Sequence, residues 1–212
     1  MTKAKNTENR GHFIVLEGID GAGKTTQAEL LIEKLTAAGR KVKRTAEPTN
    51  LPSGLEIRRA LGGEIKKSEC EMAVLFTLDR IIHNIHETEG IETALEQGYD
   101  VICDRYYYST LAYQGQSTDY GWVKAMNLSC PEIRRPDICI YLDLTPEQSL
   151  RRILRGRESV DIYENEETLT KVRNAFFSVF DDLRDTDRIA VVNAYRDTEE
   201  ISREIFSLVN SL

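Results

Sequence analysis

The chain has 212 residues, 41% of them hydrophobic, which is enough for one large domain or two small ones with a buried core. Its formal net charge of −7 argues against a general nucleic-acid-binding protein, because such proteins are usually basic. No run approaches the roughly 18 apolar residues of a membrane span, and the four cysteines show no CxxC or zinc spacing, so we expect a cytoplasmic protein that binds neither nucleic acid nor membrane.

The first half of the chain predicts two strands and several helices. Residues 1–10 are polar without an apolar core, so we expect a disordered tail and not a signal peptide. Apolar or alternating runs predict strands at residues 13–17 and 41–46. Helical spacing predicts helices over residues 24–38, 51–61, 68–85 and 91–97, and a glycine follows the first, second and fourth of these.

The second half continues the alternation. Strands are predicted at residues 100–104, 138–142 and 188–192. A helix dense in aromatic residues is predicted over 106–113, then a loop at 115–118 and a weak helix at 122–128. Thr145 caps a helix that reaches about residue 154, with Pro146 at its first position and Gln148 three residues after the cap. Apolar spacing predicts a helix over 169–183, and Asp197 caps the last helix.

Strands separated by helical segments predict an α/β fold. We expect a single domain over residues 11–212, in which a five-stranded parallel sheet carries helices on both faces, giving three layers. Ligands of such folds bind beyond the carboxyl ends of the strands. The glycine-rich stretch 18–26, Glu47–Pro48, Asp104–Arg105 and Asp143 all follow predicted strands, so we expect them at one edge of the sheet.

The glycine-rich stretch fits the pattern G-x-x-x-x-G-K-[ST], and it lies between a predicted strand and a predicted helix. Its backbone N–H groups and the helix start can converge on phosphate oxygens. Lys24 would reach the β- and γ-phosphates, and the Thr25 hydroxyl would hold Mg²⁺. A simple tight turn is the alternative, which the matching flanks disfavour. The predicted ATP-binding residues are Gly18, Ile19, Asp20, Gly21, Ala22, Gly23, Lys24, Thr25 and Thr26.

Two acidic residues are rivals for a metal role. Asp104 and Asp143 each follow an apolar strand, and an acid in this position commonly partners Mg²⁺ near a phosphate-binding loop. We favour Asp104, because Arg105 beside it can bind a phosphate with its planar fork of donors. A salt bridge at the strand end is the alternative for Asp104. The sequence does not order the strands, so Asp143 stays open as the metal partner.

Two further groups of side chains could contact a nucleotide. Phe76 and Arg80 lie four residues apart on one helix face, and a ring with a neighbouring guanidinium suits a nucleobase, although core packing is an alternative. Arg151, Arg152, Arg155 and Arg157 lie at the end of a predicted helix, before a polar stretch. They suggest a lid over residues 151–164 that brings positive charge over a phosphate, whereas a solvated helix face is the alternative.

Several stretches together resemble the thymidylate kinase family of nucleoside-monophosphate kinases. The resemblance covers nearly the whole chain after the tail, in the same order, and the combination is more specific than the glycine-rich loop alone. The stretches are Leu16-Glu-Gly-Ile-Asp-Gly-Ala-Gly-Lys-Thr-Thr26, Glu47-Pro48, Leu75-Phe-Thr-Leu-Asp-Arg80, Asp104-Arg-Tyr106 with Ser109, Ala112-Tyr-Gln-Gly115 and Tyr141-Leu-Asp-Leu144.

The resemblance implies roles for individual residues around the acceptor dTMP. Phe76 would stack on thymine, Arg80 would contact the base, and Arg105 would hold the dTMP phosphate. The other implied acceptor-side residues are Asp20 near the sugar and phosphate, Thr110 and Gln114 near the base, Tyr113 against the sugar where a 2′-hydroxyl would sit, and Asp161, Tyr163 and Glu164 in the lid.

This chain departs from the family pattern at two places. Some members carry an arginine directly after the loop aspartate, where this chain has Gly21, which matches the subclass whose lid supplies the catalytic charge. The usual Arg-Glu-Pro after the second strand is replaced by Ala46-Glu47-Pro48, so the arginine is missing. Whether Arg58 compensates is left open. The resemblance also implies a homodimer.

We therefore predict a phosphotransferase that converts ATP and dTMP to ADP and dTDP, a step of dTTP synthesis, with Mg²⁺. No general base is needed, because the acceptor phosphate is already ionised near neutral pH. Catalysis would come from Lys24, Arg105, Arg155 and Arg157 through positioning and charge neutralisation. The alternatives are another nucleoside or nucleoside-monophosphate kinase, and a nucleotide-dependent switch protein, although the guanine-reading pattern Asn-Lys-x-Asp is absent.

Overall fold

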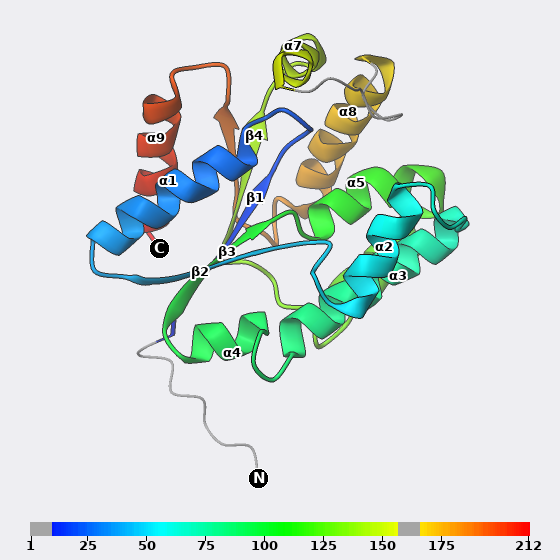
Figure 1. Ribbon diagram of the computed structural model, residues 1–212, viewed down its shortest axis with the longest axis horizontal. Helices are drawn as coiled ribbons and strands as arrows, with labels where there is room; N and C mark the ends of the chain where they lie inside the picture. The colour runs from blue at the N-terminus through cyan, green and yellow to red at the C-terminus, as the bar shows by residue number, and fades with distance from the viewer. Residues whose placement is uncertain (1–9, 157–165) are drawn as a thin grey trace.

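The computed structural model describes residues 10–156 and 166–212, and for residues 155 and 156 it describes the backbone alone (Figure 1). Its centre is a five-stranded sheet in the order β2-β3-β1-β4-β5, with every neighbouring pair parallel, as the sequence predicts. The strands are β1 (Phe13–Glu17), β2 (Lys41–Ala46), β3 (Tyr99–Asp104), β4 (Ile138–Asp143) and β5 (Ile189–Asn193).

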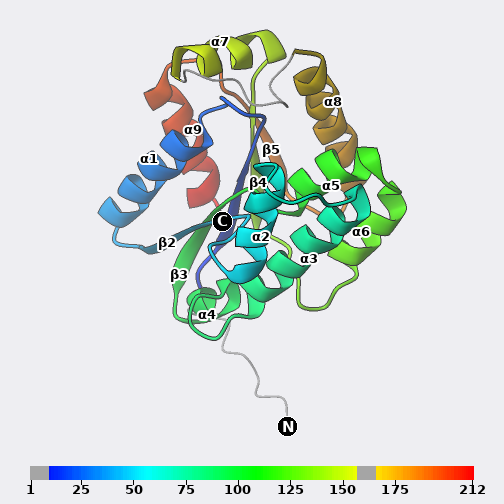
Figure 2. The ribbon, with the colours of Figure 1, turned by 45° about the vertical axis from the view of Figure 1, so that its right-hand side comes forward.

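Helices connect successive strands and cover the sheet on both sides (Figures 1 and 2). They are α1 (Lys24–Ala37), α2 (Pro52–Leu61), α3 (Glu69–Ile85), α4 (Ile91–Glu96), α5 (Tyr107–Ser117), α6 (Tyr120–Leu128), α7 (Pro146–Gly156), α8 (Glu166–Leu183) and α9 (Thr198–Asn210). Within the described residues, no helix is long and apolar enough to cross a membrane.

The central strand β1 divides the core between the two faces of the sheet. All its residues are buried, and successive side chains point to opposite faces. Phe13 and Val15 pack with residues of α3, α4, α5 and α8, whereas Ile14 and Leu16 pack with residues of α1 and α9. Figure 1 shows these two helix layers on opposite sides of the sheet, with α7 above its carboxyl edge.

Several helix ends follow the local signals in the sequence. Ser68 and Glu71 form a reciprocal capping box at the start of α3. Asp197 caps α9 through the backbone N–H groups of Glu199 and Glu200. Thr145 and Gln148 exchange backbone and side-chain hydrogen bonds at the start of α7.

The predicted loop at residues 115–118 is wrong, because α5 continues to Ser117. Gly115 does not break the helix there. Its missing side chain admits a ring of the next helix, since a Cβ on Gly115 would lie 2.9 Å from Tyr120 Cδ2. The helix ends one turn later, where the backbone N–H and hydroxyl of Thr118 both donate to the Gln114 carbonyl. Tertiary packing has therefore outweighed the weak helix propensity of glycine.

Candidate functional site

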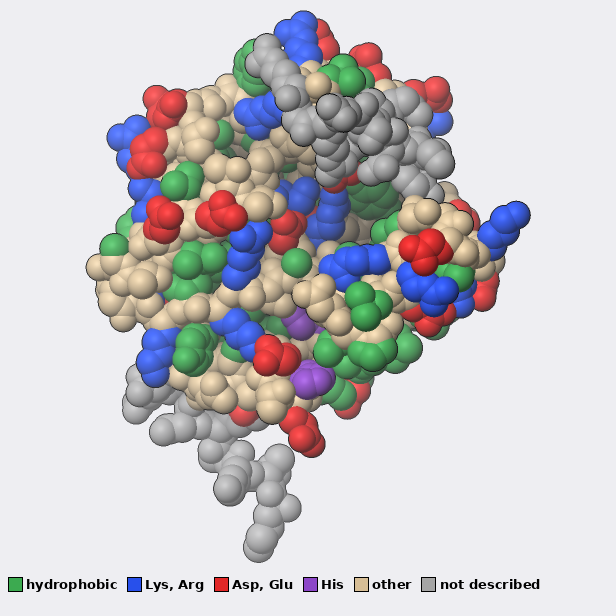
Figure 3. All heavy atoms as spheres, viewed as in Figure 1, with side chains coloured by type: hydrophobic (Ala, Val, Ile, Leu, Met, Phe, Trp, Pro, Cys, Tyr) green, Lys and Arg blue, Asp and Glu red, His purple; other side chains and the backbone are tan. Residues whose placement is uncertain are grey.

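The glycine-rich loop and the residues Asp104 and Arg105 lie together at the carboxyl edge of the sheet, since β1 and β3 are neighbours and Arg105 contacts the loop. Figure 3 shows Lys and Arg side chains gathered in a hollow in the middle of one face, between the α1 and α5 sides of the molecule. The glycine-rich loop joins β1 to α1 at this edge. Gly18, Gly21 and Gly23 have φ values of 153°, 74° and 95°, which L side chains rarely adopt. Among the described residues no side chain caps α1, so the first N–H groups of this helix are suited to an anion.

Lys24 places a cation inside the curve of this loop. Its side chain is almost fully buried, and Nζ donates to the carbonyl oxygen of Gly18 at 2.9 Å and to that of Ile19 at 3.4 Å. Burial, and next the charge of Arg105, lowers the pKa of Lys24 to about 8. Thr25 follows on the exposed side of α1. A phosphate group could replace the loop carbonyls as the partner of this ammonium.

The two rival acids lie on either side of β1, and their surroundings differ. Asp104 ends β3, and its Oδ1 is buried without a hydrogen-bond partner among the described residues. Asp143 ends β4, and Arg173 of α8 binds both of its oxygens, at 2.7 and 2.8 Å. Asp143 is thus engaged in an ion pair, whereas Asp104 keeps an unused oxygen. This difference favours Asp104 as the metal partner. The sequence could not show it, because it depends on strand order and on the ion pair with Arg173.

Arg105 reaches across from the end of β3 to the glycine-rich loop. Its Nη2 donates to Asp20 Oδ1 at 2.6 Å, and its Nη1 donates to Ser109 Oγ at 3.1 Å. The guanidinium also lies 5.6 Å from the centroid of the Tyr113 ring. Arg105 is the one described non-glycine residue with a positive φ, 66°. Such backbone conformations persist where the surrounding structure enforces them, and they are frequent at functional sites.

Arg80 is a buried side chain held in a network of hydrogen bonds. It is 1% exposed, and its Nη2 donates to Glu47 Oε2 at 2.6 Å and to Thr110 Oγ1 at 3.1 Å. Its Nη1 donates to Asn127, and His83 Nδ1 lies 3.0 Å from the other oxygen of Glu47. The structure thus brings together Arg80 and Thr110, two of the residues that the resemblance implies near the base. The sequence places Glu47 at the carboxyl edge of the sheet but does not predict its contact with Arg80, and Asn127 was missed because it carries no signal in the sequence.

Three further residues predicted for the acceptor side, Phe76, Tyr113 and Gln114, lie on α3 and α5. Phe76 is partly exposed, one helix turn before Arg80. Tyr113 and Gln114 are partly exposed on α5, and the Tyr113 ring packs edge-on against Phe176 of α8, with centroids 6.2 Å apart. The two helices that carry these side chains, α3 and α5, pack against one another.

Helix α7 packs directly on the glycine-rich loop. Ser149 Oγ donates to the carbonyl oxygen of Asp20 at 2.5 Å. A Cβ on Gly21 would lie 3.0 Å from the carbonyl oxygen of Ser149 and 3.2 Å from Ile153 Cγ1. The absence of an arginine after Asp20 therefore has a physical reason, because α7 fills the space where that side chain would begin.

Arg152 adds a cation to this contact, and the predicted catalytic residues did not include it. Its Nη1 lies 3.4 Å from the carbonyl oxygens of Gly21 and Ala22, and its Nη2 donates to the carbonyl oxygen of Ala194 at 2.8 Å. The sequence signalled Arg152 only as a member of the arginine cluster. The side chain of Arg155 and all of Arg157, Asp161, Tyr163 and Glu164 lie outside the described residues.

The segment after β2 is held from two sides. Arg58 of α2 donates to the carbonyl oxygens of Thr49 and Pro48, the latter at 2.5 Å. On the other side, Asp79 accepts from the Thr49 backbone N–H at 2.8 Å and from the Ser53 hydroxyl at 2.6 Å. Arg58 therefore places a guanidinium against the segment that follows Ala46. Ala46 is the position at which the family pattern has an arginine.

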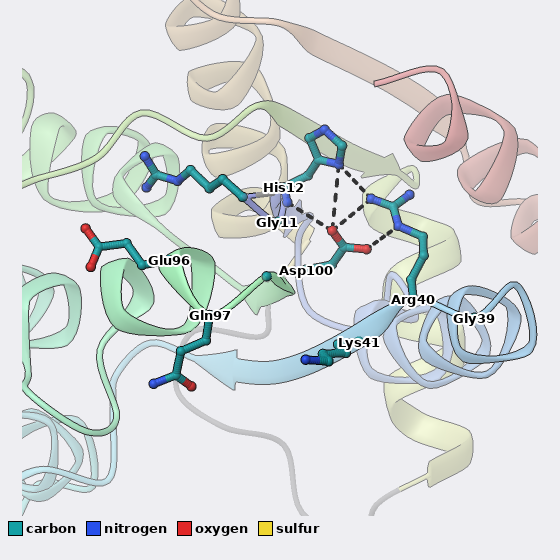
Figure 4. A pocket seen from close by; sticks show the side chains of 10 residues that line it. Gly11, His12, Gly39, Arg40, Lys41, Glu96, Gln97 and Asp100 are labelled. Atoms are coloured by element: carbon teal, nitrogen blue, oxygen red, sulfur yellow. Dashed lines mark hydrogen bonds and ion pairs between the residues drawn. The ribbon is translucent and has the colours of Figure 1, made fainter. Parts of the chain in front are cut away.

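A second hollow lies at the opposite, amino-terminal edge of the sheet. This cavity of about 630 Å³ is bordered by the starts of β1, β2 and β3. In Figure 4 the His12, Arg40 and Asp100 side chains point toward one another. Arg40 Nη2 and the His12 backbone N–H donate to the same oxygen of Asp100, at 2.8 and 2.9 Å. None of the predicted site residues that the structure describes lines this cavity, and the Asp100 carboxylate is paired with Arg40.

The comparisons with known proteins agree with this geometry. The family model described as thymidylate kinase matches residues 16–205. A Pyrococcus horikoshii protein named "Probable thymidylate kinase" is 40% identical over 210 residues, covering 94% of this chain and 96% of its own. Proteins of the same name from Methanococcus aeolicus and Archaeoglobus fulgidus are 39% and 37% identical, covering 91% and 94% of this chain and 93% and 95% of their own.

Proposed function

This chain belongs to the thymidylate kinase family, and we propose that it transfers the γ-phosphoryl group of ATP to dTMP, giving ADP and dTDP. The observation that carries the proposal is the 2.6 Å contact between Arg105 and Asp20. It joins a phosphate-binding loop with Lys24 at its centre to a second, separate cation at the end of β3. Phosphoryl transfer between two nucleotides needs two such positive sites facing one another.

On the donor side, we assign the triphosphate to the loop residues 18–26. The N-terminus of α1 and the Lys24 ammonium would meet the β- and γ-phosphates. The Thr25 hydroxyl and the unpartnered Asp104 oxygen fit a hard cation, and they would hold Mg²⁺. When bound, Mg²⁺ neutralises charge on the phosphate oxygens. Asp104 and Thr25 would then orient the donor, while Lys24 stays in place to meet the transferred group.

On the acceptor side, Arg105 is assigned to the dTMP phosphate and Phe76 to the face of thymine. Both terminal nitrogens of Arg80 are hydrogen-bonded within the fold, so we assign this residue to the floor of the base pocket beside Thr110. The bulk of Tyr113 would lie beside the sugar, and Gln114 near the base. Asp20 would meet the acceptor near its sugar and phosphate, with Arg105 as its present partner.

The lid completes the proposal. Arg155, Arg157 and Tyr163 are assigned to the closed site by their sequence positions. The contact of α7 with Asp20 and Gly21 supports this assignment, because it places the helix that leads into the lid directly beside the donor loop. Gly21 leaves no charge of its own beside the loop, so the extra positive charge would come from the lid.

Two further proposals concern assembly and location. Val74, Leu78 and Ile85 lie on one face of α3 and are 44–47% exposed, which supports a homodimer built on this helix. All four cysteines are free, as expected for a reducing compartment, which supports a cytoplasmic location.

Product analysis over a set of acceptors tests the function. ATP, Mg²⁺ and the purified protein are incubated separately with dTMP, dUMP, UMP, AMP and thymidine, and the products are identified. We expect dTDP from dTMP as the preferred reaction. Preferred use of thymidine or AMP would assign the chain to another kinase activity. ATP hydrolysis that is independent of every acceptor would indicate a nucleotide-dependent switch instead.

A further inference from the structure

Glu17 is a fully buried carboxylate that the proposed reaction does not use. It ends β1, directly before the glycine-rich loop, and has 0% exposure. Its Oε1 accepts from the backbone N–H groups of Tyr106 and Ser109 at 2.9 and 3.1 Å, and its Oε2 accepts from the Ser109 hydroxyl at 2.7 Å. Burial raises the pKa of Glu17, while Arg105 and these hydrogen bonds oppose the rise. A buried acid is costly to keep unless it is well partnered, and here the partners frame Arg105.

The Ser109 hydroxyl connects this carboxylate to the Arg105 side chain. It donates to Glu17 Oε2 and accepts from Arg105 Nη1 at 3.1 Å. The other end of the guanidinium donates to Asp20. Glu17 therefore fixes the orientation of the Ser109 hydroxyl so that a lone pair faces Arg105.

The backbone of Arg105 is held by the same strand end. The Arg105 N–H donates to the Leu16 carbonyl at 3.0 Å, and the next N–H, that of Tyr106, donates to Glu17 Oε1. Consecutive residues of β1 thus bind the two peptide groups that flank a left-handed residue with φ of 66°. A non-glycine residue keeps this conformation only where its surroundings enforce it.

We propose that Glu17 is a positioning residue that aims Arg105 at the acceptor phosphate, acting through the Ser109 hydroxyl and the Tyr106 N–H. The inference rests on the proposed function for the identity of the acceptor. It gives β1 two roles, because the strand leads into the donor loop and, through Glu17, also orients the acceptor cation. Both nucleotides would thereby be positioned by one rigid element, as in-line transfer requires.

Asp187 provides a matched control, because it is a buried carboxylate that contacts the same helix, α5. Its side chain is 1% exposed, and it accepts from the hydroxyls of Tyr107 and Tyr108 at the start of α5. Arg135 pairs with its other oxygen. Asp187 thus holds α5 with similar chemistry, yet these contacts do not include Arg105. A loss that is purely structural should appear equally when either carboxylate is changed.

The test compares Glu17→Gln, Ser109→Ala and Asp187→Asn by dTMP binding in calorimetry, by kcat and KM for each substrate, and by thermal melting. We expect Glu17→Gln and Ser109→Ala to weaken dTMP binding by about tenfold or more, with the KM for ATP changed by less than about threefold. Asp187→Asn should lower Tm and leave dTMP binding within about threefold of the parent. Ser109→Thr, which keeps the hydroxyl, should restore most of the binding.

Two results would overturn the inference. One is dTMP binding within about threefold of the parent for a folded Ser109→Ala, and the other is equal loss of dTMP affinity in Asp187→Asn. If Glu17→Gln does not fold, dTMP binding by Ser109→Ala tests the inference. Should the parent prefer another nucleoside monophosphate, the same variants are measured with that acceptor, so that failure of the dTMP assignment and failure of the Glu17 role remain distinguishable.

Discussion

The guanidinium of Arg105 lies 2.6 Å from the carboxylate of Asp20, although 85 positions separate them in the chain. This contact joins the end of β3 to the glycine-rich loop after β1, and the two strands are neighbours in the sheet. Both partners are only partly buried, so a phosphate could enter between them or beside them. The residues that we assign to the donor and acceptor halves of the site are therefore in direct contact.

Lys24 should make donor use dependent on pH. Its pKa is lowered to about 8, so the ammonium is mostly protonated at about pH 7, half protonated near pH 8 and mostly neutral above about pH 9. Because the phosphates need the charged form, kcat/KM for ATP should fall above about pH 8. Lys24→Ala should lower kcat at least about a hundredfold with the fold intact. The residual activity of Lys24→Arg should not fall above about pH 8, because arginine stays charged there. If kcat/KM for ATP of the parent protein does not change across this pH range, Lys24 does not have the assigned role.

Gly21 should tolerate no side chain, because α7 lies against it. Gly39 is the matched control, since it has a similar φ of 82°, against 74° at Gly21, but nothing within 4 Å of its Cβ position. Gly39→Ala should cost about 1–2 kcal/mol of unfolding free energy through its left-handed backbone. Gly21→Ala should cost about 1–3 kcal/mol more through the collision with Ser149 and Ile153. Urea denaturation measures both, and equal losses would show that α7 does not restrict Gly21.

Arg58 should support acceptor binding in place of the missing arginine. Arg58→Ala removes two charged donors from the Pro48 and Thr49 carbonyls, and we expect KM for dTMP to rise about tenfold. Arg59→Ala is the control, because this neighbour pairs with Glu64 at the surface. It should leave dTMP kinetics unchanged. If the two variants have similar kinetics, Arg58 does not support dTMP binding. If adding Ala46→Arg to Arg58→Ala restores the KM for dTMP, Arg58 takes the place of the arginine that is missing at position 46.

Tyr113 should discriminate against ribonucleotides. A ring beside the sugar would collide with a 2′-hydroxyl or leave it unpaired, at roughly 1–3 kcal/mol, which is about tenfold to a hundredfold in specificity. The parent should thus prefer dTMP over ribothymidine monophosphate by that range, and Tyr113→Ala should narrow the gap. The measurement is kcat/KM for both acceptors in both proteins. Equal use of the two acceptors by the parent would refute this role.

The exposed face of α3 should hold two chains together. Leu78→Glu places a charge in the centre of this face and should convert a dimer to a monomer at micromolar concentration, as measured by sedimentation or light scattering. Val191→Glu is the control, because Val191 is 47% exposed against 44% for Leu78 but lies on the edge strand β5. A monomeric parent would contradict the dimer, and dissociation by Val191→Glu alone would move the interface to β5.

The sequence by itself determined the parallel α/β sheet, most helix limits and the glycine-rich loop, because these depend on local spacing and capping. Helix starts at Ser68, Thr145 and Asp197 are examples of such signals. The resemblance of motifs in the same order added the family, which the comparisons show, and the residues proposed for the acceptor side. These features can be predicted from the sequence because they depend on residues that are close together along the chain.

Only the tertiary structure decided which side chains from distant segments contact one another at the candidate site. Asp104 and Asp143 look alike in sequence, yet Arg173 of α8 engages one of them and leaves the other with an unused oxygen. The sequence predicts that the helix ends before Gly115, but in the structure α5 continues past Gly115, which packs against Tyr120. The roles that we propose for Glu17 and Arg58 likewise rest on contacts between separate elements. Strand order and helix packing create those contacts, and no local pattern in the chain encodes them.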